Sequence, residues 1–199
     1  MKKYFLLFLI LSHLNAFTQI STQDYNFSYK VMEVAGDLNK DGLADKVVVT
    51  QDTLNENAPY RLQVFFKGAA GEWKLKATSL KIIEPQYPNG RDGYRTGTGF
   101  SDVTIKAGVL SINIELLRGH FEHEFKFQNG RFELIHFSFV SSDGRGVIET
   151  IDFNLITGIR VELLERYDTD KVISNKKTKI IIKPLPTLQN VVPMEQDLF

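Results

Sequence analysis

The residue types best suited to chemistry lie in one short acidic segment, residues 36–45, which reads GDLNKDGLAD. Oxygen-bearing side chains occupy alternate positions of this segment, and a further aspartate closes it. Calcium prefers about six to eight oxygen ligands, and this spacing turns successive side chains to one side of a loop while Gly42 allows a sharp bend. The segment therefore predicts a structural Ca²⁺ site made by the side chains of Asp37, Asn39, Asp41 and Asp45 and the backbone carbonyl of Leu43.

A plain turn that binds no ion is the open alternative, because Asn and Asp side chains also hydrogen-bond to their own backbone. An EF-hand would need a glutamate at the twelfth position and a helix after it, whereas this chain has Val48 there. The β-branched run at residues 47–50 is typical of a strand. The segment therefore predicts a loop that clamps onto a sheet, and argues against a calcium sensor.

The acidic segment resembles the D-x-N-x-D-G-x-x-D loop of FG-GAP and VCBS repeats, which occur in integrin-type propellers and in many secreted bacterial proteins. The resemblance covers residues 36–50 and occurs once; it implies calcium at the same five positions. Together with F-x-x-x-N-G-x-F-x-L-I at residues 125–135 and D-F-N-x-x-T-G at residues 152–158, the segment is similar to uncharacterised exported bacterial β-proteins. That likeness implies a fold and a compartment but no activity.

Two further pairs follow from the expected strand register. If residues 118–119 form a two-residue turn, Glu115 lies opposite Glu122, and a retaining glycosidase uses two carboxylates about 5 Å apart. The alternative function is therefore a cell-envelope glycoside hydrolase, although an ordinary solvated face explains the same pair. A second turn at residues 129–130 places His123 opposite His136 on the core face, where a neutral hydrogen-bonded pair is favoured over a zinc site or a pH-sensitive element.

The longest expected connection, residues 84–99, reads EPQYPNGRDGYRTGTG. Loops of this length without secondary structure of their own are usually functional or mobile. Tyrosine and arginine are the residue types that anchor interfaces. The connection is therefore a candidate recognition loop, with Tyr87, Arg91, Tyr94 and Arg95 as its contact residues.

Strands must position all these residues, because apolar and polar side chains alternate along most of the chain. A hairpin is expected around residues 61–77, and further strands at residues 102–106, 109–117, 120–128, 131–140, 147–154, 159–165 and 177–183. Short glycine-containing separators favour tight turns between antiparallel neighbours. The predicted fold class is all-β: an antiparallel meander that forms a curved sheet, a sandwich or an open barrel.

Composition limits the possible functions. The chain has 199 residues, zero formal net charge and no cysteine, which excludes disulfides, thiolate catalysis and cysteine-based zinc sites. A neutral chain without a basic stretch offers no electrostatic footprint for nucleic acid.

Lys2 and Lys3 precede an apolar run at residues 4–11, and Ala16 follows at a plausible cleavage position, as in a secretory signal peptide. We therefore expect a signal peptide at 1–16, a flexible lead-in at 17–28, one β domain at 29–183 and a surface tail at 184–199, with no transmembrane segment after cleavage. Together these observations favour an exported, non-catalytic domain, periplasmic or extracellular, that is stabilised by Ca²⁺ and binds a protein or glycan.

Overall fold

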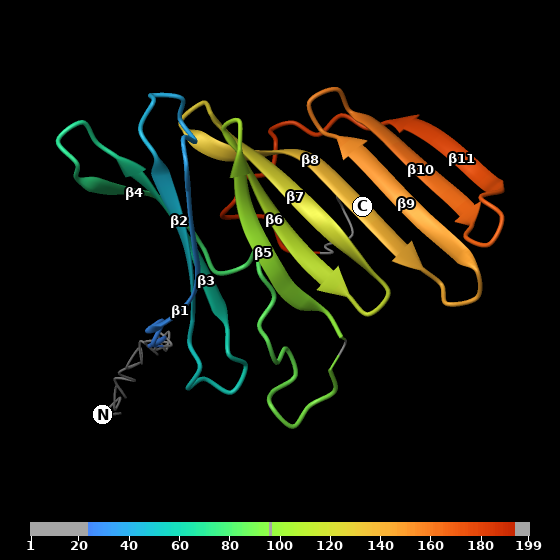
Figure 1. Cartoon of the computed structure of the whole chain (residues 1–199), viewed down its shortest axis with the longest axis horizontal. Helices are drawn as coiled ribbons and strands as arrows, with labels where there is room; N and C mark the ends of the chain where they lie inside the picture. The colour runs from blue at the N-terminus through green and yellow to red at the C-terminus, as the bar shows by residue number, and fades with distance from the viewer. Residues whose placement is uncertain (1–23, 96, 194–199) are drawn as a thin grey trace, which may run out of the picture.

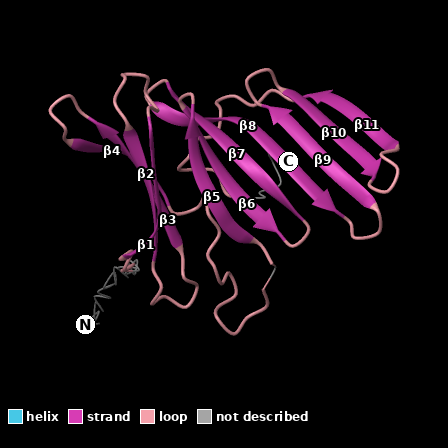
Figure 2. Ribbon diagram, in the orientation of Figure 1, coloured by secondary structure: helices cyan, strands magenta, loops and turns pink. Residues whose placement is uncertain are grey.

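The computed structural model describes residues 24–95 and 97–193, and this part of the chain contains eleven strands in two sheets and no helix (Figures 1 and 2). All pairings are antiparallel and both sheets are open, which confirms the predicted all-β meander. The expected signal peptide, residues 1–16, lies outside the described residues.

The strands of each sheet lie side by side in chain order. The first sheet contains β1 (Tyr29–Gly36), β2 (Asp45–Gln51), β3 (Tyr60–Lys67) and β4 (Trp73–Ser79). The second contains β5 (Gly99–Lys106), β6 (Val109–Leu116), β7 (Gly119–Gln128), β8 (Arg131–Ser142), β9 (Val147–Asn154), β10 (Ile159–Arg166) and β11 (Val172–Lys179).

Tight turns produce this order. At the β7–β8 hairpin, Asn129 and Gly130 both have positive φ, 53° and 77°, which is the type I′ geometry that matches the twist of two-residue hairpins. Asparagine and glycine tolerate positive φ better than other residues. The expected pairing next to this turn, Phe127 with Phe132, is confirmed.

The core lies between the first sheet and the first strands of the second. The ring centroid of Phe66 on β3 lies 4.8 Å from that of Phe127 on β7 and 6.0 Å from that of Phe132 on β8. β1 contacts β5, β4 contacts β8, and Figure 1 shows β9–β11 extending away from the first sheet. The fold is therefore a sandwich with an overhanging wing, and the outer face of the second sheet is the face turned away from the first.

The chain after β11 returns to this core. The amide of Leu134 donates to the carbonyl of Pro186 (2.8 Å), and the amide of Leu188 donates to the carbonyl of Phe132 (3.0 Å). Leu188 and Val191 are buried. Proline lacks an N–H, but its carbonyl still accepts a hydrogen bond. The described part of the expected surface tail, residues 184–193, therefore pairs with the start of β8 and contributes side chains to the core.

The expected strand at residues 177–183 is wrong in position, because β11 spans Val172–Lys179. The apolar residues at 180–182 suggested a strand continuing past Lys179. Ile180 instead donates its amide to the carbonyl of Gly158 and begins the return of the chain.

Candidate functional site

The acidic loop, residues 37–44 together with Asp45, the first residue of β2, connects β1 to β2. One carboxylate, that of Asp37, accepts hydrogen bonds from the backbone amides of residues 40, 41 and 42 at 2.6, 3.2 and 2.9 Å. Asn39 Oδ1 accepts from the amide of Asp41 (3.0 Å), and Asp41 Oδ1 accepts from the amide of Leu43 (2.8 Å). The alternating polar residues therefore satisfy the backbone of a tight turn.

Asp45 fastens this loop to the sheet. Its side chain is fully buried; Oδ2 accepts from the amide of Leu38 (2.9 Å) and Oδ1 accepts from the amide of Lys67 (3.0 Å) at the end of β3. Both carboxylate oxygens thus already accept a hydrogen bond from a backbone amide. The clamp between loop and sheet is made here by a carboxylate and two amides.

The donor set of the acidic loop fits calcium in type, since it consists of oxygen atoms only. Its arrangement is that of a hydrogen-bonded turn: Asn39 Nδ2, for example, donates to Asp41 Oδ2 at 2.8 Å. Within residues 24–95 and 97–193, no group of three or more histidine or acidic side chains is arranged to hold a metal ion. Calcium binding therefore stays a prediction.

The predicted facing pair of carboxylates is wrong. The β6–β7 turn consists of residues 117–118, so Glu115 lies opposite His120 and Glu122 lies opposite Asn113. Gly119 belongs to β7, where an added Cβ would lie 1.9 Å from the carbonyl oxygen of Val140 on β8. Glycine is required at position 119 by this close approach of two strands and not by the turn. The β6–β7 register is therefore shifted by two residues from the expected one.

The predicted facing pair of histidines is also wrong. A bulge on β8 lies between the pairs Glu124–His136 and Phe125–Leu134, which leaves Ile135 as the extra residue. The bulge turns His136 to the outer face, while His123 lies opposite Phe137 in the core and is fully buried. Burial lowers the pKa of His123 to about 3, so its imidazole is neutral at working pH.

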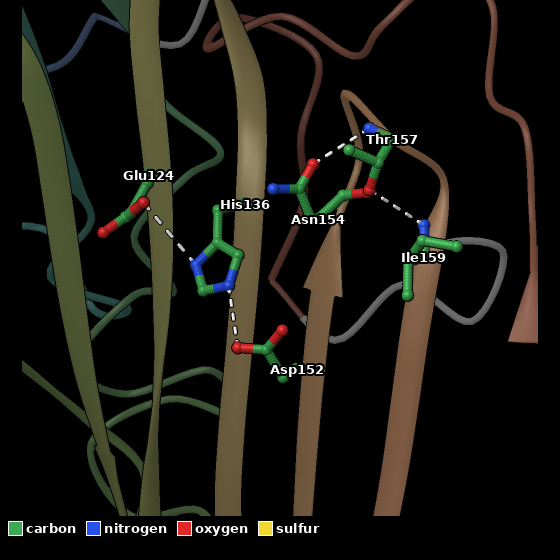
Figure 3. A network of polar contacts seen from close by, with 6 residues as sticks. All are labelled: Glu124, His136, Asp152, Asn154, Thr157 and Ile159. Carbon is green, nitrogen blue, oxygen red and sulfur yellow. Dashed lines mark hydrogen bonds and ion pairs between the residues drawn. The ribbon is translucent and has the colours of Figure 1, made fainter. Parts of the chain in front are cut away.

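On the outer face, His136 joins three neighbouring strands. Its Nδ1 lies 3.5 Å from Glu124 Oε2 on β7, and its Nε2 lies 3.0 Å from Asp152 Oδ2 on β9 (Figure 3). Burial raises the pKa of Glu124, an effect that His136 opposes and that the charges of Glu122 and Asp152 reinforce. The two ring nitrogens face different carboxylates, so the group cross-links strands and does not converge on one bound atom. The sequence did not indicate this network, because the bulge that creates it has no clear local signal.

The candidate recognition loop is firmly anchored. Arg91 donates from one guanidinium nitrogen to the carbonyls of Thr53 and Asn55, and Asn57 donates from Nδ2 to the carbonyl of Pro88 (3.1 Å). The amide of Tyr87 donates to the carbonyl of Asn57 (3.0 Å). The β2–β3 connection therefore holds the loop in place.

Three of the four predicted contact residues come together around the ring of Tyr87. The guanidinium carbon of Arg95 lies 4.8 Å from the ring centroid, and that of Arg91 lies 5.2 Å from it. Tyr94 is 79% exposed and does not join them. Arginine stacks on aromatic faces in this way because its guanidinium is planar and weakly hydrated.

A cavity of about 320 Å³, named the Tyr87 pocket, opens beside this stack. Burial raises the pKa of Tyr60, which forms part of its wall. A recess of about 40 Å³, lined in part by Glu84, adjoins it. The pocket is lined by Tyr60, Gln86, Tyr87, Pro88, Arg95, Gly97, Thr98, Gly99 and Phe100.

Two larger hollows, of about 560 and 430 Å³, lie near the end of the wing. In the first hollow Arg166 lies 3.5 Å from Asp168, and in the second Arg118 donates to the carbonyl of Asp143 at 3.4 Å. The Tyr87 pocket is the better candidate site, because three aromatic residues line it beside an arginine, whereas the two larger hollows have at most one aromatic residue in their linings.

Comparisons of the chain with family models, with curated protein sequences and with solved structures each returned no match. In the described part of the chain there is also no helix of the length and apolar character needed to cross a membrane. Any functional conclusion therefore has to come from the site itself.

Proposed function

We propose that this chain is a non-catalytic binding domain whose recognition site is the Tyr87 pocket. The observation that carries the proposal is the stacking of Arg95 and Arg91 on Tyr87, within a loop that the β2–β3 connection anchors. A binding domain needs a displayed surface on a rigid scaffold, and the sandwich supplies the scaffold. Anchoring also lowers the entropy that ordering the loop on binding would cost.

Binding is favoured over hydrolysis by the chemistry of the two candidate surfaces. The walls of the Tyr87 pocket carry no carboxylate, so no acid and nucleophile pair faces a ligand there. Glu115, one member of the alternative hydrolase pair, is exposed on the outer face and pairs with His120 across the hairpin. The hydrolase alternative therefore lacks the facing geometry from which it was argued.

We also propose that Ca²⁺ stabilises the acidic loop. The support is the oxygen-only donor set and the position of Asp45, a buried carboxylate in the same loop as the carboxylates of Asp37 and Asp41. A divalent cation would offset their mutual repulsion and leave the two amide contacts of Asp45 in place. Its role would be structural, on the opposite end of β2 from the connection that anchors the recognition loop.

Export to the periplasm or the cell exterior is part of the proposal, supported by the signal-like segment at residues 1–16. Extracellular concentrations of calcium would suit a loop that lacks the twelfth EF-hand ligand. The expected partner is a protein or a glycan.

A binding panel tests the proposed function. The purified domain is titrated with neutral saccharides, acidic saccharides and short peptides, and each interaction is repeated with Tyr87→Leu and with Tyr94→Ala. We expect at least one class to bind, with affinity lost in Tyr87→Leu and kept in Tyr94→Ala, because Tyr94 lies outside the pocket. Ligands that bind equally well to Tyr87→Leu would place the recognition site elsewhere and contradict the proposal.

A further inference from the structure

The guanidinium of Arg95 has N–H donors available for a ligand. Its guanidinium carbon lies 4.8 Å from the ring centroid of Tyr87, a contact that does not use any of its five N–H donors. No acidic side chain of the described residues forms an ion pair with Arg95. A planar carboxylate, like a phosphate, pairs with such a fork through two parallel hydrogen bonds.

The surroundings reinforce this preference for an anion. Arg91 lies on the same aromatic ring, and its hydrogen bonds go to two neutral carbonyl groups, which leave its charge uncompensated. The pocket walls contain no aspartate or glutamate. Two guanidinium groups, of Arg91 and Arg95, outnumber the one carboxylate of the adjoining recess, that of Glu84, so the local charge is positive.

The size and the other walls of the pocket describe the rest of the ligand. A volume of about 320 Å³ lies at the lower end of the roughly 300–1,000 Å³ of ligand sites, so the pocket holds a group of about one ring. The rings of Tyr60 and Phe100, whose centroids are 5.8 Å apart, provide apolar surface. Gln86 Oε1 already accepts from Gln51 Nε2 (2.9 Å), so Gln86 offers its Nε2 donors to a ligand.

The adjoining recess, with Glu84 in its wall, adds an acceptor for hydroxyl donors. A sugar ring presents C–H groups to aromatic surfaces and hydroxyls to a donor such as Gln86 Nε2 and an acceptor such as the Glu84 carboxylate. The recess and the pocket share Thr98 and Gly99 in their linings, so a substituent of the bound unit can reach Glu84.

We infer that the Tyr87 pocket binds a uronic acid unit of an acidic glycan, with the carboxylate on Arg95 and the sugar ring between the aromatic walls. This inference rests on the proposed function and names the ligand class of the same site. It is distinct from the calcium proposal, which concerns the acidic loop.

Calorimetric titration with a trigalacturonate and with its methyl ester tests the inference, because the ester keeps the shape of the sugar chain and removes its charge. We expect the acid to bind at least tenfold more tightly than the ester, and Arg95→Gln to remove this preference by lowering affinity for the acid more than affinity for the ester. Tenfold corresponds to about 1.4 kcal/mol, a modest value for a charge-assisted bidentate pair. Tyr94→Ala, on the same loop, is the matched control and keeps both affinities.

The outcomes separate the ligand class from the site. If acid and ester bind equally and Tyr87→Leu weakens both, the pocket is a binding site and the inference of an acidic sugar is wrong. A panel in which peptides bind and uronates do not also overturns the inference, while leaving the proposed function intact. If no ligand binding depends on the pocket residues, both proposals fail. Thermal melts of Arg95→Gln verify its folding, and we expect little change because the described contacts of this side chain are limited to stacking.

Discussion

Replacing Asp45 with asparagine tests the amide clamp between the acidic loop and the sheet. Asparagine keeps one acceptor oxygen but turns an NH₂ group toward the amide of either Leu38 or Lys67. A buried donor left without its acceptor costs about 1–3 kcal/mol. For a domain of this size, about 1 kcal/mol shifts the melting temperature by roughly 2–4 °C, so Asp45→Asn should lower it by about 3–10 °C.

The assay is thermal and urea unfolding in the presence of EGTA, so that only the hydrogen bonds are compared. Asp41→Asn is the matched control: the same chemical change, on an exposed side chain whose Oδ1 still accepts from the amide of Leu43. We expect the control to stay within about 0.5 kcal/mol of the wild type. An Asp45→Asn variant as stable as Asp41→Asn would mean that the buried carboxylate does not fasten the loop.

Three further predictions concern stability. The pKa of His123 is about 3 in the folded chain against an ordinary 6.5, so the unfolded chain binds a proton that the folded chain does not as pH falls below about 6.5. Going from pH 7 to pH 5 should therefore lower the free energy of unfolding by about 2 kcal/mol. His123→Phe should remove this loss in urea titrations at the two pH values. Leu188→Ala should lower the free energy of unfolding by about 2–4 kcal/mol in the same assay. Ile181→Ala, at a 57% exposed position on the same segment, should change it little. Equal effects of the two variants would contradict a core role for the C-terminal segment. If calcium binds the acidic loop, chelation should lower the melting temperature and added Ca²⁺ should restore it, and a melt insensitive to both would remove the metal proposal.

Local patterns were sufficient to predict most strands, because period-two alternation and glycine turns act over a few residues. The strand at Val147–Asn154 and the hairpin at Asn129–Gly130 are confirmed. The shift at Gly119 could not be predicted, since the carbonyl that excludes a side chain there belongs to another strand. A shift of two residues keeps every side chain on its face, which is why the apolar face was still correctly predicted.

The bulge at Ile135 had the larger consequence for the candidate sites. One extra residue reverses the facing of the side chains beyond it on the strand, so His136 leaves the core face and meets Glu124 and Asp152. Bulges depend on how neighbouring strands fit, and the residues around this one carry no glycine that would mark it. In the candidate recognition loop, residue types alone indicated Tyr87, Arg91, Tyr94 and Arg95, and the structure gathers the two arginines on Tyr87 but leaves Tyr94 apart.

Occupation of the Tyr87 pocket by a ligand can be observed at single residues by an NMR titration of the ¹⁵N-labelled domain with trigalacturonate. We predict that the amide signals that move most belong to the pocket walls, among them Gln86, Thr98 and Phe100, and that Arg95→Gln reduces these shifts at equal ligand concentration. Shifts confined to the wing or to the outer face around His136 would show that the ligand binds elsewhere, contrary to the proposed function.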